Sequence, residues 1–160
     1  MLIGVLADTH IPRRAKQLPE AVWRGLTGVN HILHAGDILD LAVLRELEKI
    51  APVTAVAGNG DPPELAEVLG RQKLFVLGGC SIGLIHGDGV KGTTRRRAQN
   101  AFPAADCIVF GYSHMPCNER ENGLLLFNPG SPTDRRRSPR PSYGLLSVAD
   151  GIVSGVIIYF

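Results

Sequence analysis

Short apolar runs recur along the chain, and in its first half they alternate with segments of helical periodicity. Several runs consist almost entirely of Val, Ile and Leu, which is typical of strands covered on both faces. The runs predict strands at Leu2–Ala7, His31–Ala35, Val53–Ala57, Leu74–Leu77, Ser81–Ile85, Cys107–Phe110, Leu124–Phe127, Tyr143–Val148 and Ile152–Tyr159.

Four segments between these runs have helical features. Asp40 is a predicted N-cap, because leucines follow it three residues apart and Asp is a preferred residue at that position. A second segment begins with Pro, which is common in a first helical turn. The predicted helices are Pro19–Leu26, Leu41–Ile50, Pro63–Leu69 and Thr93–Ala101. Asp150-Gly151 predicts a hairpin turn between the last two strands.

The order of these elements is βαβαβ, followed by a region richer in strands. This alternation favours an α/β domain. The late strands predict a second sheet that packs against the first, with helices on the outside. We expect one domain over residues 1–160, in which Asn128–Ser142, rich in Pro, Gly, Ser and Arg, is an internal loop.

Composition excludes several classes of protein. The chain is 44% hydrophobic and 20% charged, as in ordinary globular domains, and its net charge of +2 is too small to indicate nucleic-acid binding by itself. Its cysteines, Cys80, Cys107 and Cys117, show no paired spacing, so neither a disulfide framework nor a Cys-rich zinc site is predicted. No apolar stretch is long enough to span a membrane, and Asp8 interrupts the first run too early for a signal peptide. We therefore expect a soluble, cytoplasmic protein.

Five polar clusters follow directly after apolar runs or lie close behind them. They are Asp8-Thr9-His10, Gly36-Asp37, Gly58-Asn59-Gly60-Asp61, His86-Gly87 and Gly111-Tyr112-Ser113-His114. In open α/β sheets the carboxyl ends of the strands line the binding crevice, so we expect these clusters to meet. Together they offer the oxygen and imidazole donors that two neighbouring divalent metals require.

Each cluster is weak evidence alone, since Asp, Asn and Gly are common in turns. Asp8 and His10 are stronger candidates for binding one ion together, because residues i and i+2 of an extended segment point to the same face. By contrast, His31 and His34 flank an apolar run without following it, and we expect them to be structural or to support the ligands.

The motifs D-x-H, G-D, G-N, H-G and G-x-S-H, in this order, resemble the metallophosphoesterase (calcineurin-like) superfamily. The short length and Asn128-Pro129-Gly130-Ser131 resemble its small bacterial and archaeal phosphodiesterase branch. The resemblance implies a four-layer αββα fold, a two-sheet sandwich flanked by helices, with a dinuclear centre at the strand ends. It also implies one metal held by Asp8, His10 and His114, a second held by Asn59 and His86, and Asp37 bridging both. Asp37, Asn59 and His86 would be the catalytic residues.

Two positions depart from the superfamily pattern. Tyr112 stands where the second metal would have a further His. A neutral phenol is a poor ligand, so we expect Tyr112 to pack or to form a hydrogen bond, which leaves this site weaker; ligation by Tyr112 is the alternative. Gly60 replaces a His that larger members use as an acid. Asp61 could orient a ligand His or could simply be a turn residue.

Arginines form two runs, Arg95–Arg97 and Arg135–Arg137. We expect the first run to lie on a solvent-exposed face. The second follows the Asn128–Ser131 loop, and Arg135 is a candidate for contacting substrate because guanidinium groups pair well with phosphate oxygens.

The leading hypothesis is a metal-dependent phosphodiesterase or phosphatase that acts on a small phosphoester. Two divalent ions would clamp the phosphoryl group and a bridging hydroxide would attack it. Mn²⁺ is the first choice, with Zn²⁺, Ni²⁺, Fe or Mg²⁺ as alternatives and low occupancy at the second site. The rival is a protein-binding scaffold with a degenerate site, as in the small subunit of the retromer coat, which the resemblance includes. Nucleic-acid processing is a third hypothesis; homo-oligomerisation, the substrate and the native metal stay open.

Overall fold

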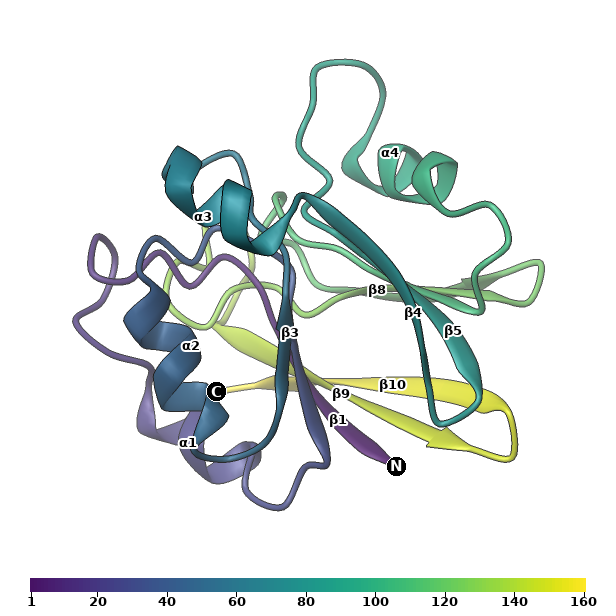
Figure 1. The fold of residues 1–160 in the computed structure, drawn as a ribbon, viewed down its shortest axis with the longest axis horizontal. Helices are drawn as coiled ribbons and strands as arrows, with labels where there is room; N and C mark the ends of the chain where they lie inside the picture. Colours follow the sequence, from purple (N-terminus) through teal and green to yellow (C-terminus); the bar gives the residue numbers. More distant parts are fainter.

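The computed structural model describes all residues, 1–160, as two five-stranded mixed sheets that face each other, with helices on the outside (Figure 1). The strands are β1 (Leu2–Leu6), β2 (His31–His34), β3 (Val53–Ala55), β4 (Gln72–Leu77), β5 (Cys80–Ile85), β6 (Cys107–Val109), β7 (Cys117–Glu121), β8 (Leu124–Asn128), β9 (Ser142–Ala149) and β10 (Ile152–Tyr159). The helices are α1 (Glu20–Gly25), α2 (Leu41–Glu48), α3 (Pro63–Leu69) and α4 (Thr94–Ala101).

The first sheet, sheet A, has the strand order β10-β9-β1-β2-β3. Strands β1, β2 and β3 are parallel, and the hairpin β9–β10 adds to them antiparallel through β9. The second sheet, sheet B, has the order β4-β5-β6-β8-β7, in which β5, β6 and β8 are parallel. Each sheet therefore contains three parallel strands, which all end at the same edge of the sheet.

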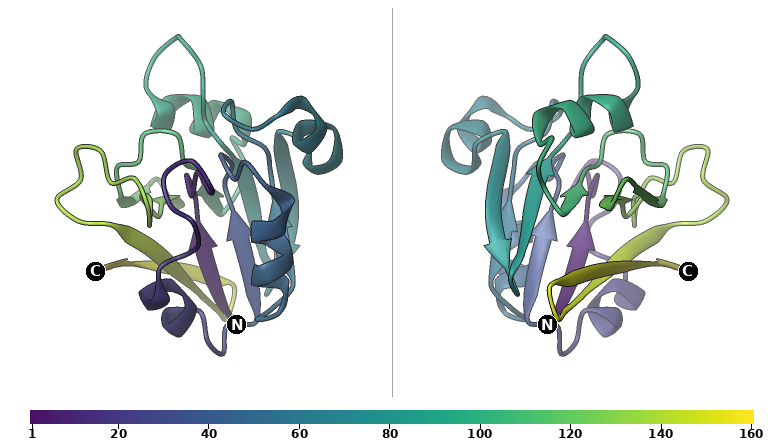
Figure 2. Two further views of the ribbon diagram at one scale, coloured as in Figure 1. Left: turned by 90° about the vertical axis from the view of Figure 1, so that its left-hand side faces the viewer. Right: turned by 90° about the vertical axis from the view of Figure 1, so that its right-hand side faces the viewer.

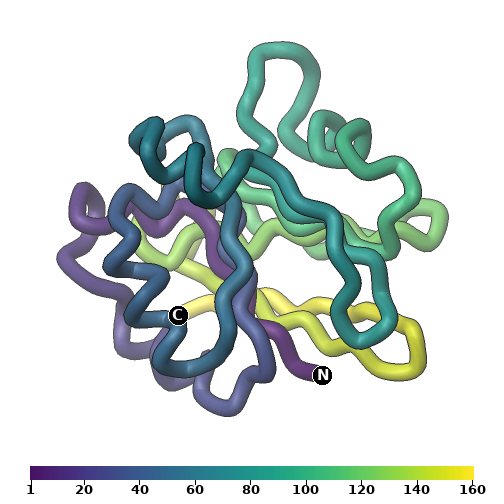
Figure 3. The backbone as a smooth tube through the Cα atoms, in the orientation of Figure 1, coloured from purple at the N-terminus to yellow at the C-terminus, as the bar shows by residue number.

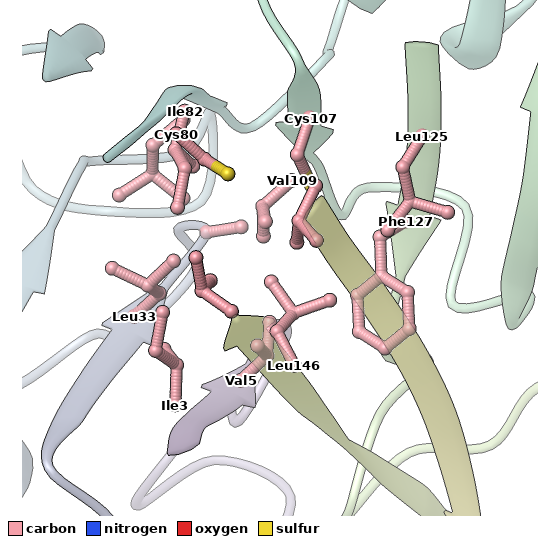
Figure 4. Packing of buried hydrophobic residues seen from close by; sticks show 14 of the residues in the cluster. Ile3, Val5, Leu33, Cys80, Ile82, Cys107, Val109, Leu125, Phe127 and Leu146 are labelled. Carbon is pink, nitrogen blue, oxygen red and sulfur yellow. The ribbon is translucent and has the colours of Figure 1, made fainter. Parts of the chain in front are cut away.

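The main core lies between the two sheets. It contains 16 buried side chains, including Ile3, Val5 and Leu33 from sheet A. Figure 4 shows these residues facing Ile82, Val109 and Phe127 of sheet B. This core covers the inner face of each sheet, which accounts for the apolar residues at alternate positions of the central strands.

Helices cover the outer faces of both sheets. Val22 of α1 and Leu44 and Leu47 of α2 pack on sheet A in a second core of 15 buried residues. Ala98 of α4, together with Phe102, packs on the outside of sheet B. The layers are thus helix, sheet, sheet, helix, and the four-layer fold expected from the sequence is confirmed.

The parallel strands deliver their loops to one end of the molecule. In Figure 2 the arrows of β1 and β2 point to the same end, where the loops that follow them gather. The loop between β5 and α4 projects farthest from the body at this end (Figure 3), and Val90 in it is almost fully exposed. This end of the sandwich holds the polar clusters singled out in the sequence.

Most local expectations are confirmed. The side chain of Asp40 caps α2 by accepting a hydrogen bond from the backbone N–H of Ala42, and the turn at Asp150-Gly151 joins β9 to β10. Strand β7 was missed because its sequence, CNERE, is polar and mostly exposed at the edge of sheet B. The longest helices have eight residues, and no helix has the length and apolar character needed to cross a membrane.

Candidate metal centre

Sharp turns at the strand ends aim the polar clusters into one space. Five residues of these clusters have positive φ angles: Asp8 (54°), His10 (45°), Asp37 (56°), Tyr112 (66°) and His114 (59°). Residues other than Gly rarely adopt this left-handed backbone conformation, because it costs free energy. Where it occurs, it is often at functional sites. Five such residues at one end of the fold therefore indicate a site that the rest of the structure holds in place.

The first group of donors contains Asp8, His10 and His114, all of them buried. The Nε2 atom of His114 lies 3.4 Å from Oδ1 of Asp8 and 3.3 Å from Nε2 of His10. The Nε2 atom of His10 lies 3.9 Å from the same oxygen of Asp8. Their ligand atoms all lie within 4.8 Å of one another, so one cation between them could contact all three side chains.

The second group contains Asp8, Asp37 and His86, which are also buried. The Oδ2 atom of Asp37 lies 3.3 Å from Nε2 of His86 and 3.4 Å from Nε2 of His10, so this carboxylate faces both groups. The Oδ1 atom of Asn59, which is exposed at the mouth of the site, lies 3.1 Å from Nε2 of His86. The structure thus brings together all six residues that the sequence predicted as ligands.

Backbone carbonyls orient two of the imidazole rings. The Nδ1 atom of His86 donates to the carbonyl oxygen of Ala35 at 2.7 Å, and Nδ1 of His114 donates to the carbonyl oxygen of Asp134. In each ring Nε2 is left facing the carboxylates. Ligand histidines in metal sites commonly have this second hydrogen bond, which fixes the ring and makes the free nitrogen a better donor.

The surroundings of Asp8 indicate that this space suits a cation. Its carboxylate is fully buried, yet neither oxygen has a hydrogen-bond partner. An ionised group buried in this way costs several kcal/mol unless a counter-charge or hydrogen bonds compensate it. Three imidazole Nε2 atoms lie within 3.9 Å of Oδ1. This donor set, carboxylate and imidazole with an amide oxygen beside it, suits Mn²⁺, Zn²⁺, Fe²⁺ or Ni²⁺.

The electrostatics of the site also favour positive charge. Burial opposes a charge on His86, but Asp37 and Asp8 outweigh it and raise the pKa of this imidazole to about 9. Burial likewise opposes ionisation of Asp37, but hydrogen bonding to His86 and to the backbone N–H of Gly60 lowers its pKa to about 2. For His10 burial prevails and lowers the pKa. Asp37 is therefore ionised at neutral pH and attracts a cation.

Two glycines allow the loops to approach each other closely. A Cβ atom on Gly58 would lie 2.2 Å from Oδ1 of Asp37, and one on Gly36 would lie 2.7 Å from Nδ1 of His86. Gly36 also has a φ angle of 92°, which glycine adopts at no steric cost. Any side chain at these positions would displace the neighbouring donor.

The carboxylate of Asp61 supports the backbone of the site. It accepts hydrogen bonds from four backbone N–H groups, those of Asp37, Ile38, Leu39 and Gly58, at 2.7–2.9 Å. The suggestion that Asp61 orients a ligand His is wrong, because both of its oxygens are occupied by these amides. It instead ties the turn after β2 to the turn after β3.

Tyr112 packs beside the second group. Its ring meets the ring of His86 edge-on, with 5.6 Å between the centroids, and the guanidinium carbon of Arg97 lies 5.6 Å from its centroid. Arg97 also donates to the carbonyl oxygens of Gly87, Lys91 and Gly92. The run Arg95–Arg97 is therefore not uniformly solvated, since Arg97 holds the projecting loop and the aromatic ring together.

Among the arginines after the Asn128–Ser131 loop, Arg136 lies closer to the site than the expected Arg135. The guanidinium of Arg135 folds back onto the carbonyl oxygen of Ser138. Arg136 instead donates to the carbonyl oxygen of Tyr112 at 3.5 Å, and its charge contributes to lowering the pKa of His10. Neighbouring arginines in one run are equivalent in sequence, so only the path of the loop distinguishes them.

Further supports come from residues that the sequence did not predict as ligands. Ser131 Oγ donates to the carbonyl oxygen of Asp8, and Thr133 Oγ1 donates to that of Thr9. His34 supports the same turn, since its Nε2 lies 3.0 Å from Thr9 Oγ1, and burial together with the charge of His86 lowers its pKa to about 3. His31 contacts Thr54 Oγ1, away from these donors. Both histidines are thus structural, and His34 positions the first turn.

Comparison with known proteins agrees with this geometry. The family model of the calcineurin-like phosphoesterase superfamily domain matches residues 1–151. A probable metallophosphoesterase of Methanothermobacter thermautotrophicus is 43% identical over 135 residues, which cover 83% of this chain and 78% of that protein.

Solved structures show the same fold. A Vps29 of Entamoeba histolytica in complex with Zn²⁺ has a TM-score of 0.77 and 24% identity, covering 99% of each chain. An archaeal phosphodiesterase has a TM-score of 0.74 and 20% identity, covering 99% of this chain and 100% of that one. The motif order, the cluster of donors and the match over nearly the whole length agree: the chain belongs to the calcineurin-like phosphoesterase superfamily.

Proposed function

We propose that this protein is a metal-dependent phosphodiesterase with a dinuclear centre. The observation that carries the proposal is the buried carboxylate of Asp8, which has no hydrogen-bond partner and lies among three imidazole nitrogens. A pair of cations would supply the partners that this carboxylate lacks. The similarity in fold to an archaeal phosphodiesterase supports phosphodiesters as the class of substrate.

Six residues would hold the cations. Asp8, His10 and His114 would hold the first, and Asn59 and His86 would hold the second. Asp37 would bridge them, because its Oδ2 faces His10 and His86 at nearly equal distances. When bound, such ions supply Lewis-acid activation of water and of the phosphoryl oxygens.

The chain itself contributes orientation and binding. Ala35 and Asp134 fix the rings of His86 and His114 through their carbonyl oxygens, so that the Nε2 atoms would face the cations in a fixed orientation. Asn59, exposed at the mouth, can donate its amide N–H to a phosphoryl oxygen. Gly60 offers no acid, so the leaving group takes its proton from solvent, and esters of acidic alcohols react fastest.

Tyr112 would weaken the second site. Its ring packs against His86 and under Arg97 where another imidazole would supply a ligand, so the second cation would keep more water and bind less tightly. We propose Mn²⁺ as the working metal, because carboxylate, amide and imidazole together suit it; Zn²⁺ is the first alternative, given the Zn²⁺ complex of the Vps29 relative.

The test is hydrolysis of bis(p-nitrophenyl) phosphate with added Mn²⁺. We expect Asp37→Asn to lower kcat/KM at least about 100-fold, since it weakens both positions at once. The matched control is Asp150→Asn, which changes the same group in the exposed β9–β10 turn and leaves the rate unchanged. Equal rates for wild type and Asp37→Asn would refute the proposal.

Metal content separates this function from a protein-binding scaffold, the alternative that the Vps29 relatives raise. Two Mn²⁺ ions per chain after equilibration support the proposed enzyme. One ion indicates a half-assembled site with slower chemistry, and no ion favours the scaffold.

A further inference from the structure

Positive charge is concentrated on two loops that lie far apart in sequence. Loop 11–17 follows His10 directly, and loop 131–141 leads into β9. Together they carry seven Arg or Lys residues and one Asp, a net charge of +6, whereas the whole chain has a net charge of +2. The remainder of the chain is therefore net negative, and the excess of positive charge lies in these two loops, here called the basic rim.

Specific contacts hold the two loops together. Asp134 forms ion pairs with Arg14 at 3.3 Å and with Arg136 at 3.9 Å. Thr133 Oγ1 also donates to the carbonyl oxygen of Thr9 at 2.6 Å. One carboxylate cannot neutralise so many cations, and the side chains of Arg14 and Arg136 remain about half exposed. The rim thus presents uncompensated charge to solvent.

The basic rim borders the metal centre on two sides. Arg136 reaches the carbonyl oxygen of Tyr112, and Asp134 in the same loop accepts from the ring of His114. On the other side, Arg13 lines an open groove of about 450 Å³ with Gly60, which follows Asn59 at the mouth. Leu39, Pro12 and Pro62 complete this groove. A substrate whose scissile phosphate lies at the centre would pass Arg13 on one side and Arg136 on the other.

We propose that the basic rim binds further phosphates of the substrate, so that the enzyme acts on phosphodiesters carrying at least one additional phosphate next to the scissile one. The proposal rests on the proposed function for the identity of the scissile group. Arg13 and Arg136 are not among the six residues that would hold the metals, so they can contact groups of the substrate beyond the scissile phosphate. Arginine side chains pair with phosphate oxygens through two parallel N–H groups, and exposed pairs of this kind weaken with salt.

The catalytic test compares two chromogenic substrates that differ by one phosphate. They are thymidine 5′-(p-nitrophenyl phosphate) and the same compound with a 3′-phosphate, both hydrolysed with Mn²⁺ at low salt. We expect kcat/KM to be about tenfold higher for the 3′-phosphorylated compound, from two exposed charge pairs. Arg13→Gln combined with Arg136→Gln lowers this ratio to near one, whereas Arg45→Gln on the exposed face of α2 leaves it unchanged.

The binding test does not require catalysis. Fluorescein-labelled hexathymidylate is titrated with the metal-free protein at several salt concentrations, and its anisotropy is measured. We expect the slope of log affinity against log salt to become shallower by about 0.7 for each of the two arginines removed. Arg45→Gln leaves the slope unchanged.

The outcomes are distinct. If neither substrate is hydrolysed but the anisotropy responds to Arg13→Gln and Arg136→Gln, the proposed function fails while phosphate binding by the basic rim stands. If the 3′-phosphate has no effect on kcat/KM and the salt slope is the same in all variants, the inference is overturned. Where the salt slope does respond to the two arginines, competition with thymidine 3′,5′-bisphosphate identifies the source of the extra phosphate. Tighter binding of hexathymidylate supports an oligonucleotide, and equal binding supports a small bisphosphate.

Discussion

Asp8 and Asp61 are both buried carboxylates at the centre, but their surroundings predict opposite responses to substitution. Asp8 has no hydrogen-bond partner, whereas Asp61 accepts from four backbone N–H groups. We predict that Asp8→Asn removes the stabilisation that Mn²⁺ confers and changes the metal-free protein little. The change without metal stays within about 1 kcal/mol, because losing the attraction between Asp8 and the protonated His86 is offset by no longer burying a carboxylate that lacks hydrogen bonds.

The magnitude follows from binding linkage. A cation that binds only the folded chain at 100 times its dissociation constant adds about 2.7 kcal/mol to the free energy of unfolding. For a chain of this length each kcal/mol raises the Tm by about 2–4 °C, so wild type gains about 5–11 °C with Mn²⁺. Asp8→Asn loses this gain.

Asp61→Asn is the contrasting variant. An amide has one acceptor oxygen, so two of the four N–H groups lose their partner, at a cost of about 1–3 kcal/mol each. This variant is therefore destabilised by about 2–6 kcal/mol both with and without Mn²⁺. The assay is thermal denaturation of the three proteins in EDTA and in Mn²⁺. The reasoning is refuted if Asp8→Asn destabilises the protein equally in both conditions, or if Mn²⁺ does not raise the Tm of wild type.

Three further predictions concern the same centre. Tyr112→His supplies the missing imidazole and raises the affinity of the weaker Mn²⁺ site by at least about tenfold in calorimetric titrations, while Tyr112→Phe does not; equal affinities would contradict the proposed defect. The pKa of His86 is raised to about 9 without metal, so this imidazole must lose a proton before it binds a cation. We therefore expect the affinity for Mn²⁺ to increase from pH 6.5 towards pH 9, with release of protons on binding. An affinity independent of pH over this range would contradict His86 as a ligand. Gly58→Ala places a Cβ 2.2 Å from Oδ1 of Asp37, so we expect a loss of about 1–3 kcal/mol in stability together with weaker Mn²⁺ binding; an unchanged affinity would show that the turn can shift freely.

Local sequence signals predicted much of the fold. The apolar runs located nine of the ten strands, and Asp40 and Asp150-Gly151 marked a helix start and a hairpin correctly. Strand β7 was not predicted because it lies at an edge of sheet B, where four of its five residues are exposed and few apolar side chains are needed. Its strand conformation comes from pairing with β8, a contact that the sequence of β7 does not encode by itself.

The positions of the supporting residues could not be read from the sequence. Asp61 was a candidate partner for a His, but the fold brings the turn after β2 against it, so its oxygens bind amides instead. Arg135 and Arg136 are adjacent and chemically identical, and the course of their loop alone sends one back onto itself and the other towards Tyr112.

The sequence by itself determined which residues could meet, because each donor follows a strand and parallel strands end at a common edge. It also determined the family, through the order and spacing of the motifs. Only the tertiary structure decided the electrostatics. It buries Asp8 without a partner, sets Asp37 between two imidazoles, and joins two basic loops more than a hundred residues apart through Asp134. Charge and desolvation depend on distances through space, and those distances exist only once the two sheets have packed.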